Sequence, residues 1–310
     1  MPSVCVIGSA NVDYALALPR LPRVGETVSG GSLLVNMGGK GANQAVAARR
    51  LGADVGLVAA VGADGAGEAV AEHLRGLGIA TEGLVRVDEI ATGTALIFVD
   101  AEGRNQIGVA PGANHRLTVE MASAHAPLVH GADVVVCQLE IPAPVVRWAL
   151  AEARRHGIPT ILNPAPMREL DDAVLALVDY LTPNAGEAAA LPGIDVRDPE
   201  SARRAAAALL ARGVGTVVVT LGDQGALVAT REQASHYPAF SVAAVDTTAA
   251  GDAFTGALAV GLAAGGSLEQ AIPLANAAAA LTCTKRGAQD ALPDRAAVEH
   301  FLRALKEGRA

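Results

Sequence analysis

The sequence predicts an α/β fold in which helices cover both faces of a mostly parallel central sheet, with a small β-sheet lid added. Apolar β-branched segments alternate with Ala-rich helical segments from residue 132 onward, and two turn-rich stretches interrupt the first third of the chain. Because crossovers between parallel strands are right-handed, this alternation places helices on both sides of one sheet. We expect a single domain over residues 1–310.

Each element of the main sheet follows from its local pattern. The first strand is expected at 4–8, an apolar run that ends in glycine. Further strands are expected at 134–140, 160–163, 181–182, 216–222, 226–230 and around 237–245, with an apolar stretch at 55–61. Helices are expected at 41–51, 67–77, 144–156, 199–212, 252–264 and 268–285.

The lid is expected from two segments that are far apart in the sequence, residues 12–38 and 92–112. The first contains several prolines and glycines among short apolar pieces, which is typical of small strands joined by turns. The second reads TALIFVD, then the turn AEGRN, then QIGVA, which indicates a hairpin.

Composition excludes several classes of protein. Hydrophobic residues make up 51% of the chain and charged residues 18%, which excludes a disordered chain. The net charge of −8 and the lack of a dense Lys/Arg stripe argue against nucleic acid or anionic membranes as partners. No apolar run is long enough to span a bilayer, and the three cysteines form no CxxC pair. We expect a cytoplasmic protein with buried, reduced thiols.

The segment DTTAAGDAFTGAL, residues 246–258, is the most informative about chemistry. Ala249, Ala250 and Gly251 are small residues at a turn from loop to helix, and Asp252 is expected to open the helix. Helix N-termini leave backbone N–H groups unpaired, so this turn can hold an anion while Asp252 accepts a proton from an attacking hydroxyl. Aspartate is also a common helix cap, and the segment alone leaves both interpretations open.

A glycine-rich turn before the helix at 41–51 is a second candidate. Gly38, Gly39 and Gly41 permit close backbone approach, Asn43 can bind a hydroxyl, and Lys40 can face a phosphate or simply be solvated. The chain contains no GxxxxGK[ST] phosphate-binding loop. The turn GSANVD after the first strand does not fit GxGxxG, which argues against a dinucleotide-binding dehydrogenase.

Polar residues at strand ends complete the candidate site. Asn11, Asp13 and Glu140 each follow an expected strand, where ligands of open α/β sheets bind, although each alone could be an exposed loop residue. Asn184 and Glu187 follow another strand and are suited to orienting water around a Mg²⁺ held by a nucleotide. The seven histidines form no HExxH or HxH pair, and we expect them to be structural or solvated.

Taken together, these segments resemble the PfkB family of sugar kinases, in particular its ribose-phosphorylating branch. GSANVD, GGKGANQA, QLE, NPAP, TPN, TLGDQG, DTTAAGD and KRGAQ occur in the family's order and cover nearly the whole chain. The resemblance implies an enzyme that transfers a phosphoryl group from ATP to O5 of D-ribose, with Asp252 as general base. It also implies Mg²⁺ bound with ATP, K⁺ as activator, and a homodimer formed through the lid.

The resemblance also assigns residues to roles. The anion hole falls on Ala249, Ala250 and Gly251. Sugar contacts fall on Asn11, Val12, Asp13, Gly39, Lys40, Gly41, Ala42, Asn43, Glu140 and Asp252. ATP contacts fall on Asn184, Thr220, Leu221, Gly222, Asp223, Gln224, Gly225, Gly251 and Asn276. Water-mediated Mg²⁺ contacts fall on Asn184 and Glu187, and K⁺ contacts on Asp246, Thr248, Thr282, Lys285, Gly287 and Ala291.

Two departures from the family pattern and several alternatives stay open. Ala185 and Gly186 replace an acid that often follows Asn184, and Asn276 stands where some members have a histidine. A 2-deoxyribose kinase, a fructokinase and a nucleoside kinase are the nearest rivals, and Val12 could tune acceptance of a 2-hydroxyl. Only eight aromatic residues are present, which weakly disfavours a nucleoside. A non-catalytic sugar-binding protein is disfavoured because both Asp252 and Gly251 are present.

Overall fold

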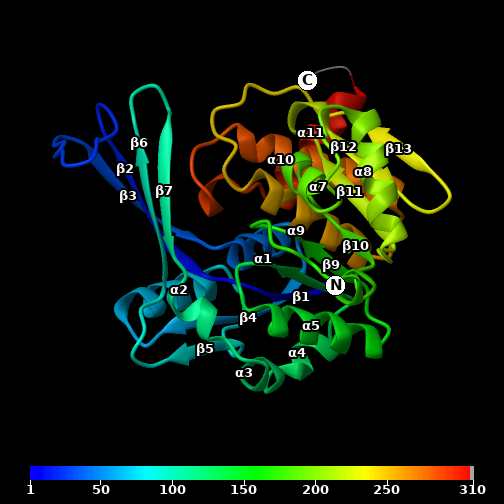
Figure 1. The fold of residues 1–310 in the computed structure, drawn as a ribbon, viewed down its shortest axis with the longest axis horizontal. Coiled ribbons are helices and arrows are strands. Elements are labelled where there is room, and N and C mark those ends of the chain that lie inside the picture. Colours follow the sequence, from blue (N-terminus) through cyan, green and yellow to red (C-terminus); the bar gives the residue numbers. More distant parts are fainter. Residues whose placement is uncertain (308–310) are drawn as a thin grey trace.

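The computed structural model describes residues 1–307, so the last three residues of the expected domain, 308–310, lie outside the described part. It contains one nine-stranded sheet and one four-stranded sheet (Figure 1). The strand order of the large sheet is β13-β12-β11-β10-β9-β8-β1-β4-β5. Its strands are β1 (Ser3–Ile7), β4 (Asp54–Gly62), β5 (Leu84–Val87), β8 (Val134–Gln138), β9 (Thr160–Asn163), β10 (Tyr180–Leu181), β11 (Thr216–Thr220), β12 (Ala226–Ala229) and β13 (Ala234–Tyr237).

Seven neighbouring strands of this sheet, from β5 at one edge through β4, β1, β8, β9 and β10 to β11, pair in parallel. Only β12 and β13, at the other edge, are antiparallel. The expected mostly parallel sheet is therefore confirmed. In a parallel sheet all carboxyl ends meet at one edge, so the loops after β1, β8, β9, β10 and β11 lie together. Those loops begin with the segments expected to bind ligand.

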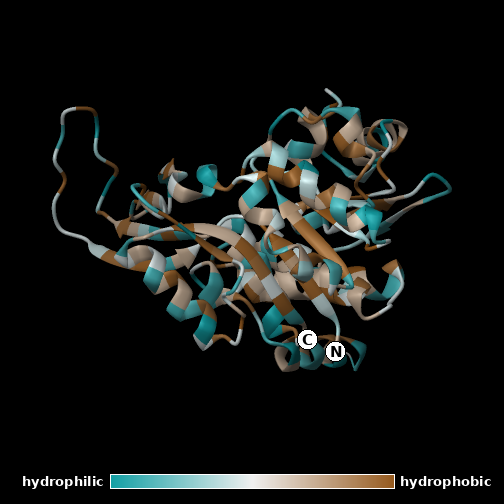
Figure 2. Cartoon of the chain, turned by 90° about the horizontal axis from the view of Figure 1, so that it is seen from below, coloured by the Kyte–Doolittle hydropathy of each residue, from teal (hydrophilic) through white to brown (hydrophobic). Residues whose placement is uncertain are grey.

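The two faces of the large sheet carry separate cores. Along β1, Val4 and Val6 belong to one hydrophobic cluster, while Cys5 and Ile7 belong to the other. Strand side chains alternate between faces, so a strand buried on both sides is apolar along most of its length. Figure 2 shows the apolar strands of this sheet at the centre of the molecule.

Helices cover both faces, as the sequence predicts. One face packs against α1 (Lys40–Arg50), α2 (Gly65–Gly76), α9 (Ala250–Ala263), α10 (Leu268–Cys283) and α11 (Arg295–Lys306). The other packs against α3 (Val119–Ser123), α4 (Ala126–His130), α5 (Ala143–Arg155), α6 (Asp172–Leu175), α7 (Ala185–Ala190) and α8 (Pro199–Ala211). Within residues 1–307, none of these helices combines the length and apolar character that crossing a bilayer requires.

The four-stranded sheet projects from the body and has the order β3-β2-β6-β7 (Figure 1). Its strands are β2 (Asn11–Ala17), β3 (Ser32–Gly38), β6 (Gly93–Val99) and β7 (Asn105–Ala110). Residues 39–92 separate the first two strands from the last two in sequence, yet β2 and β6 pair in parallel. The small sheet is thus built from the two segments in which the sequence predicts strands.

Two local predictions are wrong. Strand structure was expected around 237–245, but β13 ends at Tyr237 and the following residues 238–245 form no strand. Pro238 has no N–H to donate to a neighbouring strand, which ends the pairing there. In addition, α9 begins at Ala250 and not at Asp252, so Asp252 lies within the first turn of the helix.

Candidate active site

Asp252 is the centre of the site. Its side chain is buried, and both carboxylate oxygens accept hydrogen bonds from amides of α1. Asn43 Nδ2 donates to Oδ2 and Gln44 Nε2 donates to Oδ1, each at 2.9 Å. Burial raises the pKa of Asp252, while the nearby Lys40 and the two amides partly oppose that rise. The carboxylate is therefore fixed in orientation and more basic than an ordinary aspartate.

Gln44 extends this arrangement into a network that sequence reasoning missed. Its amide nitrogen also lies 3.1 Å from Asn163 Oδ1, and its oxygen accepts a 2.6 Å bond from Gln138. Gln138 and Asn163 are the last residues of β8 and β9, so two strand ends and one helix together hold Asp252. These three residues stand in the motifs GANQA, QLE and NPAP, where only Asn43 of the amide residues was expected to have a role.

The N-terminus of α9 is shaped to receive an anion. Ala249 caps the helix with a φ of 60°, a left-handed conformation that is uncommon for a residue with a side chain. A Cβ added at Gly251 would meet no atom of the described residues within 4 Å, so the space in front of the helix is open. Backbone N–H groups at such a terminus carry partial positive charge and can approach an anion closely.

Asp13 and Glu140 lie near Asp252 and share its negative field. Burial is the main cause that raises the pKa of Asp13 to about 6, and repulsion from Glu140 and Asp252 adds to it. The Asp13 Oδ1 atom is buried and has no hydrogen-bond partner among residues 1–307. A buried acceptor without a donor is costly, so this atom is prepared for a hydroxyl supplied by a ligand.

Lys40 is the cation that balances these acids. Attraction to Asp252, and then to Glu140 and Glu187, raises the pKa of Lys40 despite its burial. The Lys40 backbone N–H and the hydroxyl of Ser9 both donate to Glu140 Oε2, at 3.0 and 2.5 Å. The start of α1 is thereby tied to the end of β8. Ser9 is a second residue that the sequence motifs did not single out.

Asn11 is positioned by Asn114, which sequence reasoning also missed. Asn114 Nδ2 donates to Asn11 Oδ1 at 2.7 Å, and Asn114 Oδ1 accepts from the Ala10 N–H at 3.0 Å. Gly39 has a φ of 86°, and a Cβ there would lie 2.8 Å from the Ala10 Cα. A Cβ at Gly41 would lie 2.5 Å from the Ser9 nitrogen. Both glycines are needed because the turn crosses the loop after β1 at close range.

Two residues expected to contact the sugar lie elsewhere. Val12 and Ala42 are buried in the hydrophobic core, each with 2% of its surface exposed. Val12 also points to the opposite face of the small sheet from Asp13, because neighbouring strand residues alternate. Their side chains cannot reach a ligand in this arrangement, which leaves only their backbone groups.

A cleft of about 800 Å³ adjoins Asp252. Its wall contains residues from the large sheet's loops, the N-terminus of α9 and the irregular segment 238–245. Of the residues expected to act in catalysis or to bind sugar, ATP or Mg²⁺, it is lined by Lys40, Asn184, Glu187, Thr220, Gly222, Asp223, Gly225, Ala249, Ala250, Gly251, Asp252 and Asn276. The residues expected at the nucleotide and at the anion hole are therefore largely brought together.

Two of the expected ATP contacts do not line the cleft. Leu221 is buried, and the exposed Gln224 donates to the Arg197 carbonyl at 3.2 Å. Asn276 does line it, with Nδ2 3.3 Å from the Pro238 carbonyl. Asn276 thus braces the segment 238–245 that forms one wall of the cleft.

Asn184 and Glu187 form the capping box of α7. Asn184 Oδ1 accepts from the Glu187 N–H, and Glu187 Oε2 accepts from the Asn184 N–H, each at 2.9 Å. Burial raises the pKa of Glu187, with the Asn184 N–H and Lys40 opposing the rise. Because one carboxylate oxygen is used by the cap and Glu187 still lines the cleft, the other oxygen is suited to accept from water around a metal.

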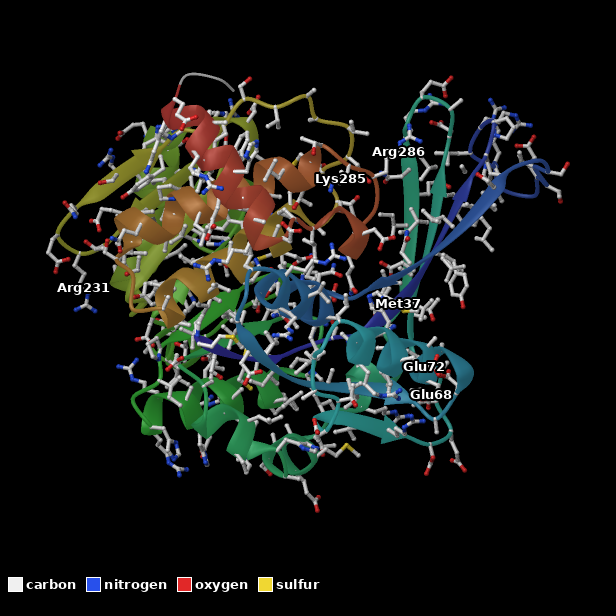
Figure 3. The ribbon with its side chains drawn as sticks, turned by 180° about the vertical axis from the view of Figure 1, so that it is seen from behind. Met37, Glu68, Glu72, Arg231, Lys285 and Arg286 are labelled. Atoms are coloured by element: carbon white, nitrogen blue, oxygen red, sulfur yellow. The ribbon has the colours of Figure 1, made fainter. Side chains whose placement is uncertain are left out.

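The residues expected at a K⁺ site come from two segments that touch. Asp246 Oδ1 accepts from the Thr248 N–H and hydroxyl, and Asp246 Oδ2 accepts from the Gly287 N–H at 3.0 Å. Burial alone would raise the pKa of Asp246, but these bonds outweigh it and hold the pKa below its ordinary value. Thr282 and Ala291 are buried, whereas Lys285 projects into solvent from the loop after α10 (Figure 3). Both carboxylate oxygens of Asp246 are therefore occupied by N–H and O–H donors that tie the two segments together.

The three cysteines differ in burial. Cys5 and Cys137 are fully buried in the core, as expected, and all three are free thiols. Cys283 is only half-buried and lies in the wall of the cleft, which departs from the expectation of a buried thiol.

Comparisons with known proteins cover nearly the entire chain. The model of the pfkB family of carbohydrate kinases matches residues 1–295. A ribokinase from Haemophilus influenzae is 38% identical over 97% of this chain and 98% of its own length. A deoxyribokinase from Salmonella typhi is also 38% identical, over 96% and 97% respectively. The structure of Arabidopsis thaliana ribokinase complexed with ribose and ATP is 32% identical over 97% of this chain and 99% of that chain, with a TM-score of 0.92.

Proposed function

The chain belongs to the pfkB family of carbohydrate kinases, and from this premise we propose that it transfers the terminal phosphoryl group of ATP to O5 of D-ribose. Three relatives named ribokinase support this substrate at 38%, 40% and 40% identity over nearly their full length. Within the chain, the single observation that carries the proposal is the buried Asp252 carboxylate beside the open N-terminus of α9. The products are D-ribose 5-phosphate and ADP.

Asp252 acts as the general base. As the sugar hydroxyl oxygen attacks the terminal phosphorus, its proton passes to a carboxylate oxygen of Asp252, and the bond from phosphorus to the bridging oxygen of ADP breaks. The raised pKa of Asp252 favours acceptance of that proton. The amides of Asn43 and Gln44 keep the carboxylate pointed at the hydroxyl.

The backbone of Ala249, Ala250 and Gly251 stabilises the phosphoryl group in transfer. N–H groups at the helix terminus face the developing negative charge, and they need no reorganisation when the reaction occurs. Gly251 leaves room for the phosphoryl oxygens to approach these groups. Lys40, which three acids hold in its charged form, adds a positive charge on the same side.

The sugar is proposed to lie between the small sheet and α1. The unpartnered Asp13 Oδ1 accepts one sugar hydroxyl, and Asn11, Asn43 and Glu140 offer further polar atoms. Gly39, Lys40 and Gly41 contribute backbone groups from the tight turn before α1, as do Val12 and Ala42 where their backbone is accessible. A polyol requires several such acceptors at once.

ATP is proposed to occupy the 800 Å³ cleft, a size typical of small-molecule sites. The nucleotide contacts are Asn184, Thr220, Gly222, Asp223, Gly225, Gly251 and Asn276. Leu221 and Gln224 instead hold the shape of the loop, since neither lines the cleft.

Mg²⁺ and K⁺ are proposed as the ions of the reaction. Asn184 and Glu187 would orient water molecules around a Mg²⁺ ion held by the ATP phosphates, and that ion would supply charge neutralisation there. K⁺ would be held by the segments around Asp246, Thr248, Thr282, Lys285, Gly287 and Ala291, mostly through backbone oxygens. Bound there, it would brace the loop that precedes the anion hole.

The small sheet is proposed to act as a lid from residues 12–38 and 92–112, and to join two chains in a homodimer. It carries Asp13 at its base, so closure would bring that carboxylate onto the sugar and exclude water. Six large apolar side chains on this sheet are more than 45% exposed, which supports a second chain as partner: Leu33, Leu34, Val35, Leu96, Ile107 and Val109. We also propose that the protein acts in the cytoplasm, where ATP, its phosphoryl donor, is abundant.

A 2-deoxyribose kinase is the second candidate. The deoxyribokinase from Salmonella typhi is as similar in sequence as the ribokinase from Haemophilus influenzae, both at 38% identity. Discrimination depends on groups that would pair with the 2-hydroxyl, and losing such a partner usually costs a large factor in kcat/KM.

An assay of ADP release separates these possibilities. Ribose, 2-deoxyribose, fructose and adenosine are each supplied with Mg²⁺-ATP, in K⁺ or in Na⁺ at the same ionic strength. We expect ribose to give the highest kcat/KM and K⁺ to raise the rate. A higher kcat/KM for 2-deoxyribose would favour the second candidate, the 2-deoxyribose kinase. Equal rates in K⁺ and in Na⁺ would refute the proposed K⁺ site.

Substitution Asp252→Asn tests the mechanism directly. Asparagine keeps the size and its one oxygen can still accept a hydrogen bond from α1, but it cannot accept the hydroxyl proton. We expect turnover to fall by roughly 10²–10⁴-fold while ribose binding, measured by calorimetry, persists. Asp54→Asn, at an exposed aspartate, is the control and should retain full turnover. Near-normal turnover of Asp252→Asn would refute the base assignment.

A further inference from the structure

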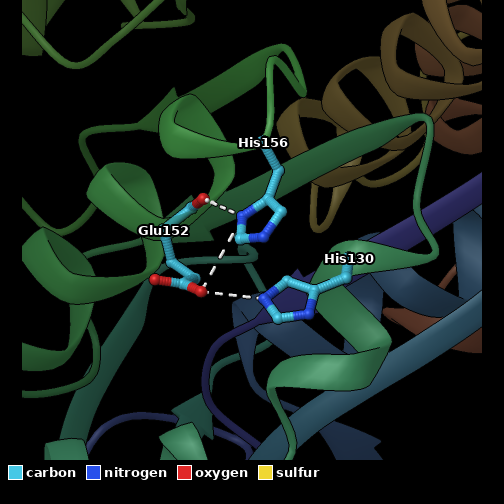
Figure 4. Close-up of side chains that lie close together, drawn as sticks. All are labelled: His130, Glu152 and His156. Carbon is cyan, nitrogen blue, oxygen red and sulfur yellow. Dashed lines mark hydrogen bonds and ion pairs between the residues drawn. The ribbon is translucent and has the colours of Figure 1, made fainter.

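Two histidines and a glutamate meet at one end of α4 and α5 (Figure 4). His130 is the last residue of α4, Glu152 lies on α5, and His156 is the C-cap of α5. His130 Nε2 is 2.8 Å from Glu152 Oε1, and His156 Nδ1 is 3.8 Å from the same oxygen. One ligand atom from each residue lies within 4.8 Å of the other two. The sequence predicted only structural or solvated histidines, because His130 comes from a different helix.

These separations suit a bound metal ion. A tetrahedral ion with bonds of about 2.0–2.2 Å keeps neighbouring ligand atoms about 3.3 Å apart. The two distances at Glu152 Oε1, 2.8 and 3.8 Å, lie on either side of that value, so small side-chain rotations would bring both distances to it. His156 Nδ1 also lies 3.0 Å from the Glu152 backbone oxygen, a contact that it would exchange for the ion.

The carboxylate of this cluster is buried, whereas its two imidazole rings are partly exposed. The Glu152 side chain is 10% exposed, whereas those of His130 and His156 are 38% and 35% exposed. The hydrogen bond from His130, together with Arg155, keeps the pKa of Glu152 below its ordinary value despite its burial. Arg155 binds the other carboxylate oxygen at 2.9 Å, which leaves Oε1 directed at the two rings. The imidazole rings stack with centroids 3.9 Å apart and an angle of 28° between their planes, so the rings would have to rotate out of this stack for one ion to lie in the plane of both.

We propose that His130, Glu152 and His156 bind a divalent transition-metal ion of the Zn²⁺ class and thereby fasten α4 to α5. Two imidazole nitrogens and one carboxylate oxygen are preferred by Zn²⁺, Ni²⁺ or Co²⁺, whereas Mg²⁺ prefers oxygen ligands alone. Water would fill the fourth position, which faces solvent between the two exposed rings. The ion holds two helices that otherwise contact each other through few residues.

This site is separate from the proposed catalytic cleft. Strand β8 ends beside the cleft at Gln138, and α5 then runs back along the sheet to reach the start of β9 at Thr160. The C-terminus of α5 therefore lies at the opposite edge of the large sheet, and none of the three residues lines the cleft. The proposal neither needs nor supports the kinase assignment.

Zinc binding to chelator-treated protein, measured by calorimetry in the presence of excess Mg²⁺, is the test. We expect one Zn²⁺ per chain with a micromolar or lower Kd. His130→Ala, His156→Ala and Glu152→Gln should each weaken binding by at least about 100-fold, because even an outer-shell partner is worth 10–100-fold. His125→Ala is the matched control, since His125 caps the other end of α4 outside the cluster. It should bind as the wild type does.

A second readout is the melting temperature. Zn²⁺ should raise the melting temperature of the wild type and of His125→Ala, but not that of the three cluster variants, and Mg²⁺ should not replace it. His130→Gln serves in place of His130→Ala if the latter does not fold in the absence of zinc. The proposal is wrong if wild-type protein does not bind Zn²⁺, or if the variants that remove His130 and His156 bind it undiminished.

Discussion

Asp13 differs from an ordinary surface aspartate in its hydrogen bonding and in the charges around it. Its Oδ1 has no partner among residues 1–307, and two further carboxylates lie close enough to repel it. A group that lowers the stability of the empty protein in this way is expected where a ligand later supplies the missing contact.

The raised pKa of Asp13 predicts a pH-dependent gain of stability in Asp13→Asn. With a pKa of about 6 when folded and 3.8 as its ordinary value, the folded protein binds this proton more tightly than the unfolded chain. The cost of the charge is therefore small at acid pH, grows as the pH rises from about 4 to 6, and is complete above about pH 6. Asparagine avoids that cost, so the variant should gain about 2 kcal/mol more at pH 7.5 than at pH 4.5.

Urea denaturation of both proteins at the two pH values measures this difference. Asp54→Asn is the control, because Asp54 is exposed, and its effect should be the same at both pH values. An equal stability change for Asp13→Asn at pH 4.5 and 7.5 would show that the Asp13 charge is not penalised in the folded protein.

Single residues were predicted unevenly from the sequence, for a physical reason. Asp252, Asp13 and Glu140 follow helix starts or strand ends, and local pattern identifies such positions. Gln44 and Asn114 do not. Gln44 has its role only when β8, β9 and α1 have come together, and Asn114 only when its segment packs against Ala10 and Asn11. The sequence pattern does not mark an amide on a helix face as functional. Only the tertiary contacts show which side chain it binds.

At the scale of elements, the crossing of α1 and α9 positions the proposed base. Asn43 and Gln44 on α1 bond to Asp252 on α9, so the spacing between the two helices sets both bonds. Gly256 lies at this crossing: a Cβ there would be 2.6 Å from the Ala47 Cβ and 2.9 Å from the Gln44 carbonyl oxygen. Small residues on both helices are what permit this approach.

Gly256→Ala should therefore be destabilising, contrary to the usual effect of alanine in a helix. Helix propensity alone would favour alanine by about 1 kcal/mol. Overpacking at this crossing should outweigh that gain and cost about 1–3 kcal/mol, and it should lower kcat by moving Gln44 away from Asp252. Melting temperature and turnover are the measurements.

Gly76→Ala is the matched control for that substitution. Gly76 ends α2, and a Cβ there would meet none of the described atoms within 4 Å, so stability and turnover should hold or improve. If Gly256→Ala were as stable and active as the control, the helix spacing would not limit the site.

Elements were predicted best where hydrophobic pattern and capping agree. The buried strands β1, β8 and β11 and the helices α5 and α8 lie within two residues or so of the expected bounds. The segment 238–245 misled because its apolar residues line the cleft and do not pair with a strand. Apolar residues indicate that a segment is shielded from water, but they do not show whether it pairs with a sheet or lines a binding cleft.

At the scale of the whole molecule, the four-stranded sheet is the least self-sufficient part. Both of its faces carry large exposed apolar side chains, and monomeric proteins rarely present so many together. Strand register separates the two sets. Val35 and Leu96 flank Tyr14 on one face, while Leu34 lies beside Ala15 and Ile107 beside Ile97 on the face that also carries Asp13.

This arrangement predicts that the chain forms a dimer in solution. Charged residues introduced on the small sheet should dissociate that dimer. We expect light scattering to give twice the mass of one chain for the wild type. The double variants Leu34→Asp/Ile107→Asp and Val35→Asp/Leu96→Asp each place two carboxylates on one face, and desolvating them in an interface would cost several kcal/mol. At least one of the two should be monomeric at micromolar concentration, and the one that dissociates identifies the face in contact.

Met167→Asp is the control for added charge, because Met167 is an exposed apolar residue that is not part of the small sheet, and it should leave the dimer intact. Activity adds a separate measure. If the partner chain holds the lid over the sugar, the monomeric variant should show a raised KM for ribose with little change in the KM for ATP, since the cleft proposed for ATP lies on the large sheet. A wild type with the mass of one chain, or a dimer that survives both double variants, would contradict the proposed interface and leave the exposed faces to another partner.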